Sequence, residues 1–465
     1  MTHLDTSALS ADMNGEVVDP AHADYHQHRR VFNAMIDRRP ALIARCTSAE
    51  DVAAAVRFAR DEGLPISVYC GGHGVTGNAV CDDGLVIDLR PMNGIQVDAG
   101  ARTCRAQGGI NWGEFDAATQ EHGLAVTGGR VPGTGIAGLA LGSGSGWIER
   151  KFGLTCDNLI SVEIVTADGE IIRASEEENS DLFWATRGGG GNFGVVTEFE
   201  LRLHELGPLV YGGMLMYPGP MGADVLRNFR DFIADAPDEV GGGVALITAP
   251  PEEFIPEPAR GKPAVGVILC YAGPAEEAEE ALRPLTEFGP PAVAMVGPMP
   301  YVAVQQLIAP GAPEGMRNYW NADFLAELPD EAIEILCDAH MRAPSPLAQV
   351  ILVPGGGAIS RVDNEAMALA QREAPFNLHI LTMWPEPSMD EACIAWTKEL
   401  GAAMKPFATG RAYLNFIGDE GEERVIAAFG TEAYARLQAL KDRYDPDNLF
   451  RANHNIRPSQ AAAPA

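Results

Sequence analysis

Three glycine-dense loops in the first half of this 465-residue chain hold the residues whose spacing could support binding chemistry. They span residues 70–74, 128–146 and 188–194, and the first of them contains a histidine, His73. Glycine permits close backbone approach and positive φ, so such loops can aim amide N–H groups at the phosphates of an extended ligand. Any single glycine pair is an ordinary turn. Three dense runs in one half of the chain instead predict convergence on one phosphate-bearing cofactor.

The second loop also matches a dinucleotide-binding fingerprint, G-x-G-x-x-G, from Gly133 to Gly138. Asp157 lies downstream at a distance suited to a ribose contact. A true fingerprint follows a buried strand and opens a long helix. Here residues 127–132 contain glycines and a proline, and residues 139–146 are too rich in glycine for a helix interior. The sequence therefore disfavours a nicotinamide cofactor.

Short strands and capped helices are expected to hold these loops. Ser48 opens a capping box for a helix that stops at Gly63, and a strand at 65–69 runs straight into the histidine loop. Further strands are predicted at 85–89, 95–97, 159–167, 170–174 and 195–203, with helices at 111–122 and 180–185. Beyond Pro208, strands such as 265–270 and 349–353 alternate with helices at 224–234, 275–286 and 363–372, before a helical tail from Glu432. This change in the pattern of predicted strands and helices beyond Pro208 predicts a two-lobed α+β fold.

Charge and composition exclude several classes of protein. The net charge is −30, from 34 basic and 64 acidic side chains, which disfavours nucleic acid and anionic membranes as partners. No apolar stretch reaches the roughly 18–20 residues that span a bilayer, and the start lacks a secretory signal pattern, so a cytoplasmic protein is expected. The eight cysteines never form a CxxC pair, which predicts buried free thiols and no metal site.

Four motifs resemble those of the FAD-linked oxidases of the vanillyl-alcohol-oxidase superfamily: VYCGGH at 68–73, GLVIDL at 84–89, FGLTCDN at 152–158 and DLFWATRGGGGNFG at 181–194. The ending, at 444–450 and 453–456, is similar to that of the berberine-bridge-enzyme-like branch. The resemblance covers residues 38–458. It implies a PCMH-type FAD-binding domain over 1–205, a substrate-binding domain with an antiparallel sheet over 206–415, and a C-terminal segment, 416–465, that returns to the first domain.

The resemblance further implies that His73 bonds covalently to the isoalloxazine ring of FAD. Such a bond raises the reduction potential of the flavin and so favours difficult hydride abstractions. Many relatives carry a second link through a cysteine at the position of Val131, so one link, through His73 alone, is expected here. The cysteines expected to stay unattached are Cys70, Cys104 and Cys156.

Two positions in the expected FAD site depart from the family pattern. Tyr69 stands where relatives usually carry arginine, and Gly133 stands where they often carry histidine or threonine. The resemblance places the remaining FAD contacts at Cys70, Gly71, Gly72, Gly74, Thr134, Gly135, Gly138, Gly144, Val195, Asn453 and Asn455.

The expected catalytic residues lie near the end of the second lobe. Strand alternation over 377–384 places His379, Leu381 and Met383 on one face. His379 matches the position of the catalytic glutamate or glutamine of relatives, and its ordinary pKa near ~6.5 would suit a base at neutral pH; the alternative is a packed core histidine. Tyr413 and Asn415 resemble the family's Tyr-x-Asn motif and would share one side of a strand. As a base, Tyr413 would need a pKa well below about 10.

The resemblance implies a substrate pocket lined by Tyr319, Trp320 and Asn321, to which Trp384 is added as a nearby aromatic. The expected reaction oxidises a small alcohol, phenol or related secondary metabolite by hydride transfer to FAD, with dioxygen as acceptor and hydrogen peroxide as product. The alternatives are a dehydrogenase with another acceptor, a redox-neutral cyclase or isomerase, and a flavin-binding protein without turnover.

Overall fold

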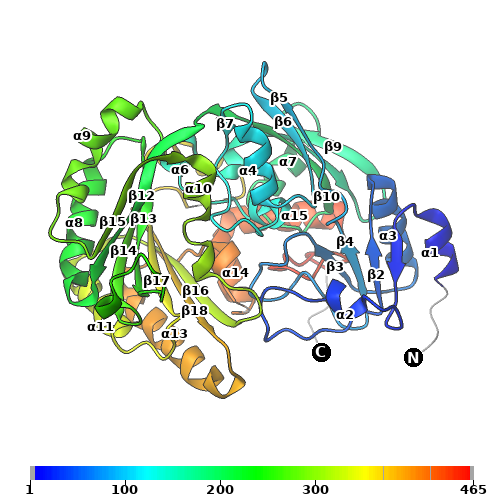
Figure 1. Ribbon diagram of the computed structural model, residues 1–465. Coiled ribbons are helices and arrows are strands. Elements are labelled where there is room, and N and C mark those ends of the chain that lie inside the picture. The colour runs from blue at the N-terminus through cyan, green and yellow to red at the C-terminus, as the bar shows by residue number, and fades with distance from the viewer. Residues whose placement is uncertain (1–5, 370, 419, 461–465) are drawn as a thin grey trace.

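Two principal sheets form the N-terminal lobe in the computed structural model, which describes residues 6–369, 371–418 and 420–460 (Figure 1). One sheet has the order β1-β2-β4-β3 with β2, β4 and β3 parallel, and the other is antiparallel with the order β5-β6-β10-β8-β9; β7 and β11 form a separate pair. The strands are β1 Glu16–Val18, β2 Leu42–Arg45, β3 Ile66–Tyr69, β4 Leu85–Asp88, β5 Ile95–Asp98, β6 Thr103–Gln107, β7 Leu124–Ala125, β8 Leu159–Val165, β9 Ile171–Ser175, β10 Val195–Arg202 and β11 His204–Glu205.

The three helices that the sequence predicts in this lobe, α3, α4 and α7, begin where it places them. Ser48 accepts a hydrogen bond from the Asp51 amide at the start of α3, and Asn111 forms a capping box with Glu114 at the start of α4. The helices are α1 Ser7–Asp12, α2 Tyr25–His28, α3 Ala49–Asp61, α4 Trp112–Gln120, α5 Ile136–Leu141, α6 Glu149–Phe152 and α7 Ser180–Thr186.

The short helix α5 corrects one expectation from the sequence. Residues 139–141 are helical despite the glycines around them, but α5 has only six residues and ends at Gly142. No strand lies between β7 and α5 in this described part of the chain. The long helix and preceding buried strand of a dinucleotide fingerprint are therefore missing here, as the sequence indicates.

A seven-stranded antiparallel sheet forms the central lobe, with the order β15-β12-β14-β13-β17-β18-β16. Helices α8, α9, α11 and α13 cover one face of this sheet and share an apolar core with it (Figure 1). The opposite face is turned toward the N-terminal lobe. The elements are β12 Leu209–Pro218, α8 Gly222–Asp235, β13 Val240–Thr248, β14 Pro263–Tyr271, α9 Ala275–Thr286, β15 Val293–Pro300, α10 Tyr301–Gln306, β16 Arg317–Leu325, α11 Asp330–His340, β17 Gln349–Pro354, α12 Ala358–Arg361, β18 Phe376–Trp384 and α13 Asp390–Met404.

The helix predicted at 363–372 is wrong for the described residues 363–369 and 371–372, none of which is helical, and residue 370 lies outside the described residues. The amide of Glu365 is capped by the Asp363 carboxylate, and the carbonyls of Glu365 and Ala366 accept hydrogen bonds from Trp184 and Arg187 of the N-terminal lobe. These contacts occupy backbone carbonyls that a helix would need for its own i to i+4 hydrogen bonds. Residues 364–368 therefore form turns and bends, and Met367 and Ala368 pack into the core of the N-terminal lobe.

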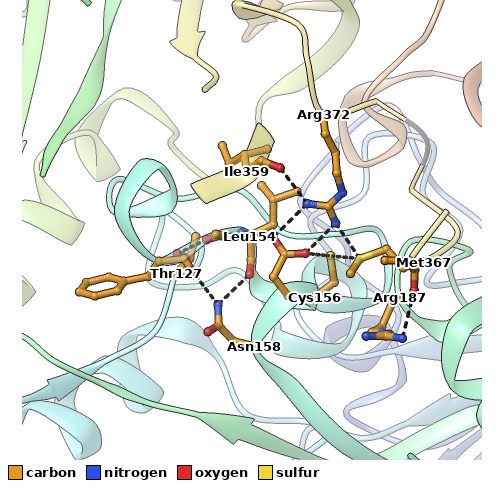
Figure 2. Close-up of polar contacts among 12 residues, drawn as sticks. Thr127, Leu154, Cys156, Asn158, Arg187, Ile359, Met367 and Arg372 are labelled. Atoms are coloured by element: carbon orange, nitrogen blue, oxygen red, sulfur yellow. Dashed lines mark hydrogen bonds and ion pairs between the residues drawn. The ribbon is translucent and has the colours of Figure 1, made fainter. Parts of the chain in front are cut away.

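One buried ion pair fixes this segment in place. Arg372 donates from Nη2 to Oδ1 of Asp157 at 2.6 Å and from Nη1 to Oδ2 at 3.1 Å. Figure 2 shows Arg372 extending beside Ile359 and Met367 toward the loop that carries Cys156. Its guanidinium also donates to the Ile359 carbonyl and the Met367 sulfur. Because Asp157 is engaged in this pair, it is not available for the ribose contact that a nicotinamide cofactor would need.

The chain then returns to the N-terminal lobe. Helices α14 Glu422–Phe429 and α15 Thr431–Tyr444 pack their apolar residues, including Phe429 and Leu437, into the core of that lobe. The Lys441 ammonium is fully buried and donates to Asp445 and to the carbonyls of Asn192 and Phe450. Within the described residues, no helix is both long enough and apolar enough to cross a membrane.

Candidate active site

A cavity of about 360 Å³ lies between the two lobes. All three glycine loops contribute to its wall, together with the face of β16, β17 and β18 that helices α8, α9, α11 and α13 leave uncovered and the segment 450–454. Two of the loops touch so closely that a Cβ on Gly135 would lie 2.3 Å from the Gly71 amide nitrogen. The convergence predicted from the glycine pattern is therefore confirmed.

The cavity fits an extended anionic cofactor. A Cβ added to Gly74, Gly138 or Gly191 would meet no atom within 4 Å, so each of these backbones borders open space along the wall. None of the described residues that line the cavity is an aspartate or glutamate. Phosphates would thus meet glycine backbone and asparagine side chains without a competing carboxylate.

His73 stands in the first glycine loop, directly after strand β3, and lines the cavity. Its ring stacks on Phe32 with centroids 4.6 Å apart, and a Cβ on Gly133 would lie 3.2 Å from its Nε2. Burial lowers the pKa of His73 to about 4. The imidazole is therefore neutral at physiological pH, which leaves one ring nitrogen with a nucleophilic lone pair.

The other expected flavin contacts near His73 do not offer a reactive side chain. Val131 and Cys70 both line the cavity, but Cys70 is buried and its thiol donates to the Ile110 carbonyl. Burial raises the pKa of Cys70 to about 11, so it remains a thiol. Tyr69 lies outside the cavity lining, donates to the Arg30 carbonyl and stacks under Arg90 at 4.0 Å.

His379 lies on β18 and faces the cavity with Leu381 and Met383, as strand alternation predicts. Its ring stacks on Phe416, with centroids 4.3 Å apart, and its Nε2 is buried without a hydrogen-bond partner. Burial, with a smaller contribution from Arg130, lowers the pKa of His379 to about 3. The expectation of an ordinary histidine pKa near ~6.5 is therefore wrong, because burial disfavours the charged form of the ring.

Tyr413 and Asn415 are not on a strand, because residues Leu414–Phe416 form a 3-10 turn. The two side chains still meet, since Asn415 Nδ2 donates to the Tyr413 hydroxyl at 3.2 Å, and the Ser145 amide donates to the same hydroxyl at 3.0 Å. Asn415 lines the cavity, and burial raises the pKa of Tyr413 to about 12. This shift is opposite to the one a tyrosine base would need.

The comparisons with known proteins agree with this geometry. Residues 40–175 match a family described as FAD binding domain, and residues 412–457 match one described as Berberine and berberine like. The chain is 32% identical to the (R)-6-hydroxynicotine oxidase of Paenarthrobacter nicotinovorans over 463 residues, which cover 97% of this chain and 98% of the relative. The chain belongs to the berberine-bridge-enzyme-like family of FAD-linked oxidoreductases.

Other relatives support the same family assignment and fold. An FAD-linked oxidoreductase of Dictyostelium discoideum is 30% identical, with 96% of each chain covered. The crystal structure of 6-hydroxy-D-nicotine oxidase from Arthrobacter nicotinovorans superimposes with a TM-score of 0.88 at 31% identity, covering 98% of this chain and all of the other. Physcomitrella patens BBE-like 1 shares the fold, with a TM-score of 0.87 at 21% identity.

As an FAD-linked oxidoreductase, the chain brings most of its expected site residues to the cavity. The expected residues that line it are Cys70, Gly71, Gly72, His73, Gly74, Val131, Thr134, Gly135, Gly138, Val195, Trp320, His379, Asn415 and Asn453. Those outside its lining are Tyr69, Gly133, Gly144, Tyr319, Asn321, Trp384, Tyr413 and Asn455.

Strand geometry explains why three of the four expected substrate residues lie elsewhere. Tyr319 and Asn321 flank Trp320 on β16, so they face away from the cavity; Lys398 lies over the Tyr319 ring, and Asn321 donates to Glu420. Trp384 is on the helix-covered face of β18 and donates to Asp390. Only Trp320 of this set reaches the cavity.

The sequence reasoning missed Arg130, the one lysine or arginine among the described residues that line the FAD site. Arg130 sits inside the second glycine loop, directly before Val131. A buried partner, Glu149, lies 3.5 Å from its guanidinium. An arginine within a glycine loop was the available signal, but nothing in the sequence shows which way its side chain turns.

Proposed function

We propose that this enzyme oxidises a small, largely apolar substrate at an alcohol, phenol or related group, using FAD attached through His73 alone and dioxygen as the electron acceptor. The observation that carries the proposal is the single cavity that joins His73 on the glycine-loop wall to His379 on the sheet wall. The similarity to an oxidase at 32% identity supports dioxygen as acceptor.

The neutral imidazole of His73 supports covalent attachment, and the absence of a cysteine at Val131 supports a single link. Bound FAD would accept a hydride from the substrate carbon and pass electrons onward. The glycine backbones of the three loops and Asn453 would hold its phosphate-bearing part. Asn415, which is tied to Tyr413, offers an amide for the polar edge of the flavin or the substrate.

On the sheet wall, Trp320, Leu381 and Met383 would exclude water around the apolar body of the substrate. His379 remains neutral above a pH of about 3, so we assign it the role of a hydrogen-bonding residue that orients the reacting hydroxyl. As the hydride passes to the flavin, the proton of that hydroxyl would pass to solvent water, without a fully formed histidinium.

Acid precipitation followed by peptide mass mapping tests the attachment. Flavin should stay with the protein and map to the peptide that contains His73, and the His73→Ala variant should release its flavin in acid. A Cys70→Ala variant serves as the control and should retain it. Flavin recovered on any cysteine, or released from the wild-type protein, contradicts the proposal.

A second experiment separates the classes of reaction. Substrate added without oxygen should bleach the flavin absorbance, and admission of oxygen should restore it with formation of hydrogen peroxide. Slow recovery in oxygen but fast recovery with an artificial acceptor would instead identify a dehydrogenase. Product formation without bleaching would identify a redox-neutral enzyme.

A further inference from the structure

Arg130 is the feature of the cavity that the proposed oxidation leaves without a role. It is the one permanently charged side chain on the described cavity wall, and 9% of its side chain is exposed. A cation removed from water in this way is costly unless charged or polar groups compensate it. Its surroundings therefore show what the site is built to bind.

The guanidinium is held rigidly but is not saturated with partners. Its hydrogen bonds leave from Nη2, to the Ser145 hydroxyl at 2.9 Å and the Gly146 carbonyl at 3.1 Å. The Trp147 ring lies 4.6 Å away, and the Glu149 carboxylate lies 3.5 Å from Nη2. Nε is buried without a hydrogen-bond partner. Nε is likewise unpaired in six other arginines of the described chain, among them Arg150 and Arg372, so what distinguishes Arg130 is its place on the cavity wall, where a ligand can supply the acceptor.

Glu149 does not remove this need. It lies behind Arg130, outside the cavity lining, on the wall of a separate cavity of about 40 Å³. One of its oxygens, Oε2, accepts the Gly146 amide at 2.9 Å, and burial raises its pKa. The carboxylate thus orients the guanidinium from one side and leaves the cavity side of Arg130 without a negative partner.

A second polar group without a partner faces the same cavity from the sheet wall. His379 is 2% exposed, its Nε2 has no hydrogen-bond partner, and it is close enough to Arg130 for the cation to act on its ionisation. A neutral imidazole can donate its N–H to an anionic oxygen and accept a hydrogen bond at its other ring nitrogen, so His379 can serve both this oxygen and the reacting hydroxyl. Around this pair the wall is apolar, with Trp320, Leu381 and Phe416.

We infer that the substrate carries a carboxylate, which binds between Arg130 and His379 while its apolar body packs on the aromatic wall. The planar guanidinium matches a carboxylate through charge-assisted hydrogen bonds, and burial strengthens them. This inference rests on the proposed function, because it names the class of molecule that enters the same cavity.

Benzoate and benzamide are suitable probes, since they have the same shape and differ in charge. Each is titrated into the flavin-loaded enzyme and followed by the change in flavin absorbance and by thermal shift. Benzoate should bind at least tenfold more tightly than benzamide. The Arg130→Gln variant should abolish that preference, and Arg130→Lys should retain part of it.

Two further variants keep the test decisive. Arg150→Gln removes another buried arginine, which donates to the Gly355 and Ala236 carbonyls outside the cavity, and should leave the preference intact. Glu149→Gln removes the rival carboxylate and should tighten benzoate binding severalfold, which tests the inference even if Arg130→Gln fails to fold.

Equal binding of the two probes to the wild-type enzyme, or a benzoate preference that survives in Arg130→Gln, overturns the inference. If Arg130→Gln does not fold, unchanged benzoate binding in Glu149→Gln overturns it instead. Each of these results can occur while flavin remains attached to His73 and is reduced by substrate, in which case the proposed function stands. Flavin released in acid would contradict the proposed attachment and leave the probe preference unaffected.

Discussion

The Asp157→Asn substitution should destabilise the enzyme strongly, because it leaves the buried Arg372 guanidinium without its counter-charge. The side chains of Arg372 and Asp157 are 1% and 8% exposed, and the pair is bidentate. Removing one partner of such a pair costs about 3–5 kcal/mol, whereas an exposed pair contributes about 0–1 kcal/mol. We therefore expect a loss of about 3–5 kcal/mol in the free energy of unfolding.

Urea denaturation of the flavin-loaded enzyme, followed by tryptophan fluorescence, measures this loss. The matched control is Asp181→Asn, which breaks the exposed pair between Asp181 and Arg443, whose side chains are 37% and 61% exposed. The double variant Asp157→Asn/Arg372→Met should cost less than the sum of the two single changes. A cost for Asp157→Asn equal to that of the control would refute the reasoning, since the buried cation would then need no partner.

Three other outcomes follow from the geometry. The unfolded state binds a proton at His379 below a pH of about 6.5, but the folded state does so only near about 3. Stability is therefore lost as pH falls through this window, and His379→Gln should lose less than wild type between pH 7 and 5 in thermal melts. Trp320→Ala should change substrate KM at least severalfold, whereas Trp384→Phe, on the helix side of the sheet, should lower the melting temperature and leave KM unchanged. Lys441→Met should lower the fraction of enzyme that acquires flavin, measured by the ratio of flavin to protein absorbance in the purified protein, because the ammonium holds the carbonyl of Asn192 within the third glycine loop.

Sequence patterns correctly predicted the features that depend only on residues close together in the chain. The capping residues Ser48 and Asn111 mark helix starts correctly, because an N-cap depends on atoms within three residues. Strand alternation also placed His379 correctly with Leu381 and Met383, because it too depends only on neighbouring residues. The helix predicted at 363–372 is wrong because Trp184 and Arg187, far away in the sequence, take the carbonyls of that segment.

The pKa values of the site residues could not be predicted from the sequence. The lowered pKa of His379 and the raised pKa of Tyr413 both come from burial between lobes, which depends on long-range packing. The direction of the Arg130 side chain depends likewise on Trp147 and Glu149, which meet it only in the folded chain. Residue types predicted what could react there, and tertiary packing determines how each one ionises.

The sheet wall has a consequence for how this enzyme could acquire new substrates. Its cavity-facing side chains form cross-strand rows: Trp320, Leu381 and Gln349 share one row, and His379 pairs with Ile351 in the next. Neighbouring strands lie about 4.8 Å apart, and successive same-face residues lie roughly 6.6 Å apart. Substrate-facing positions thus form a lattice on a backbone that is hydrogen-bonded on both sides at β17 and β18. A combinatorial library restricted to these positions would reshape the pocket in small, regular steps, with little need for loop remodelling.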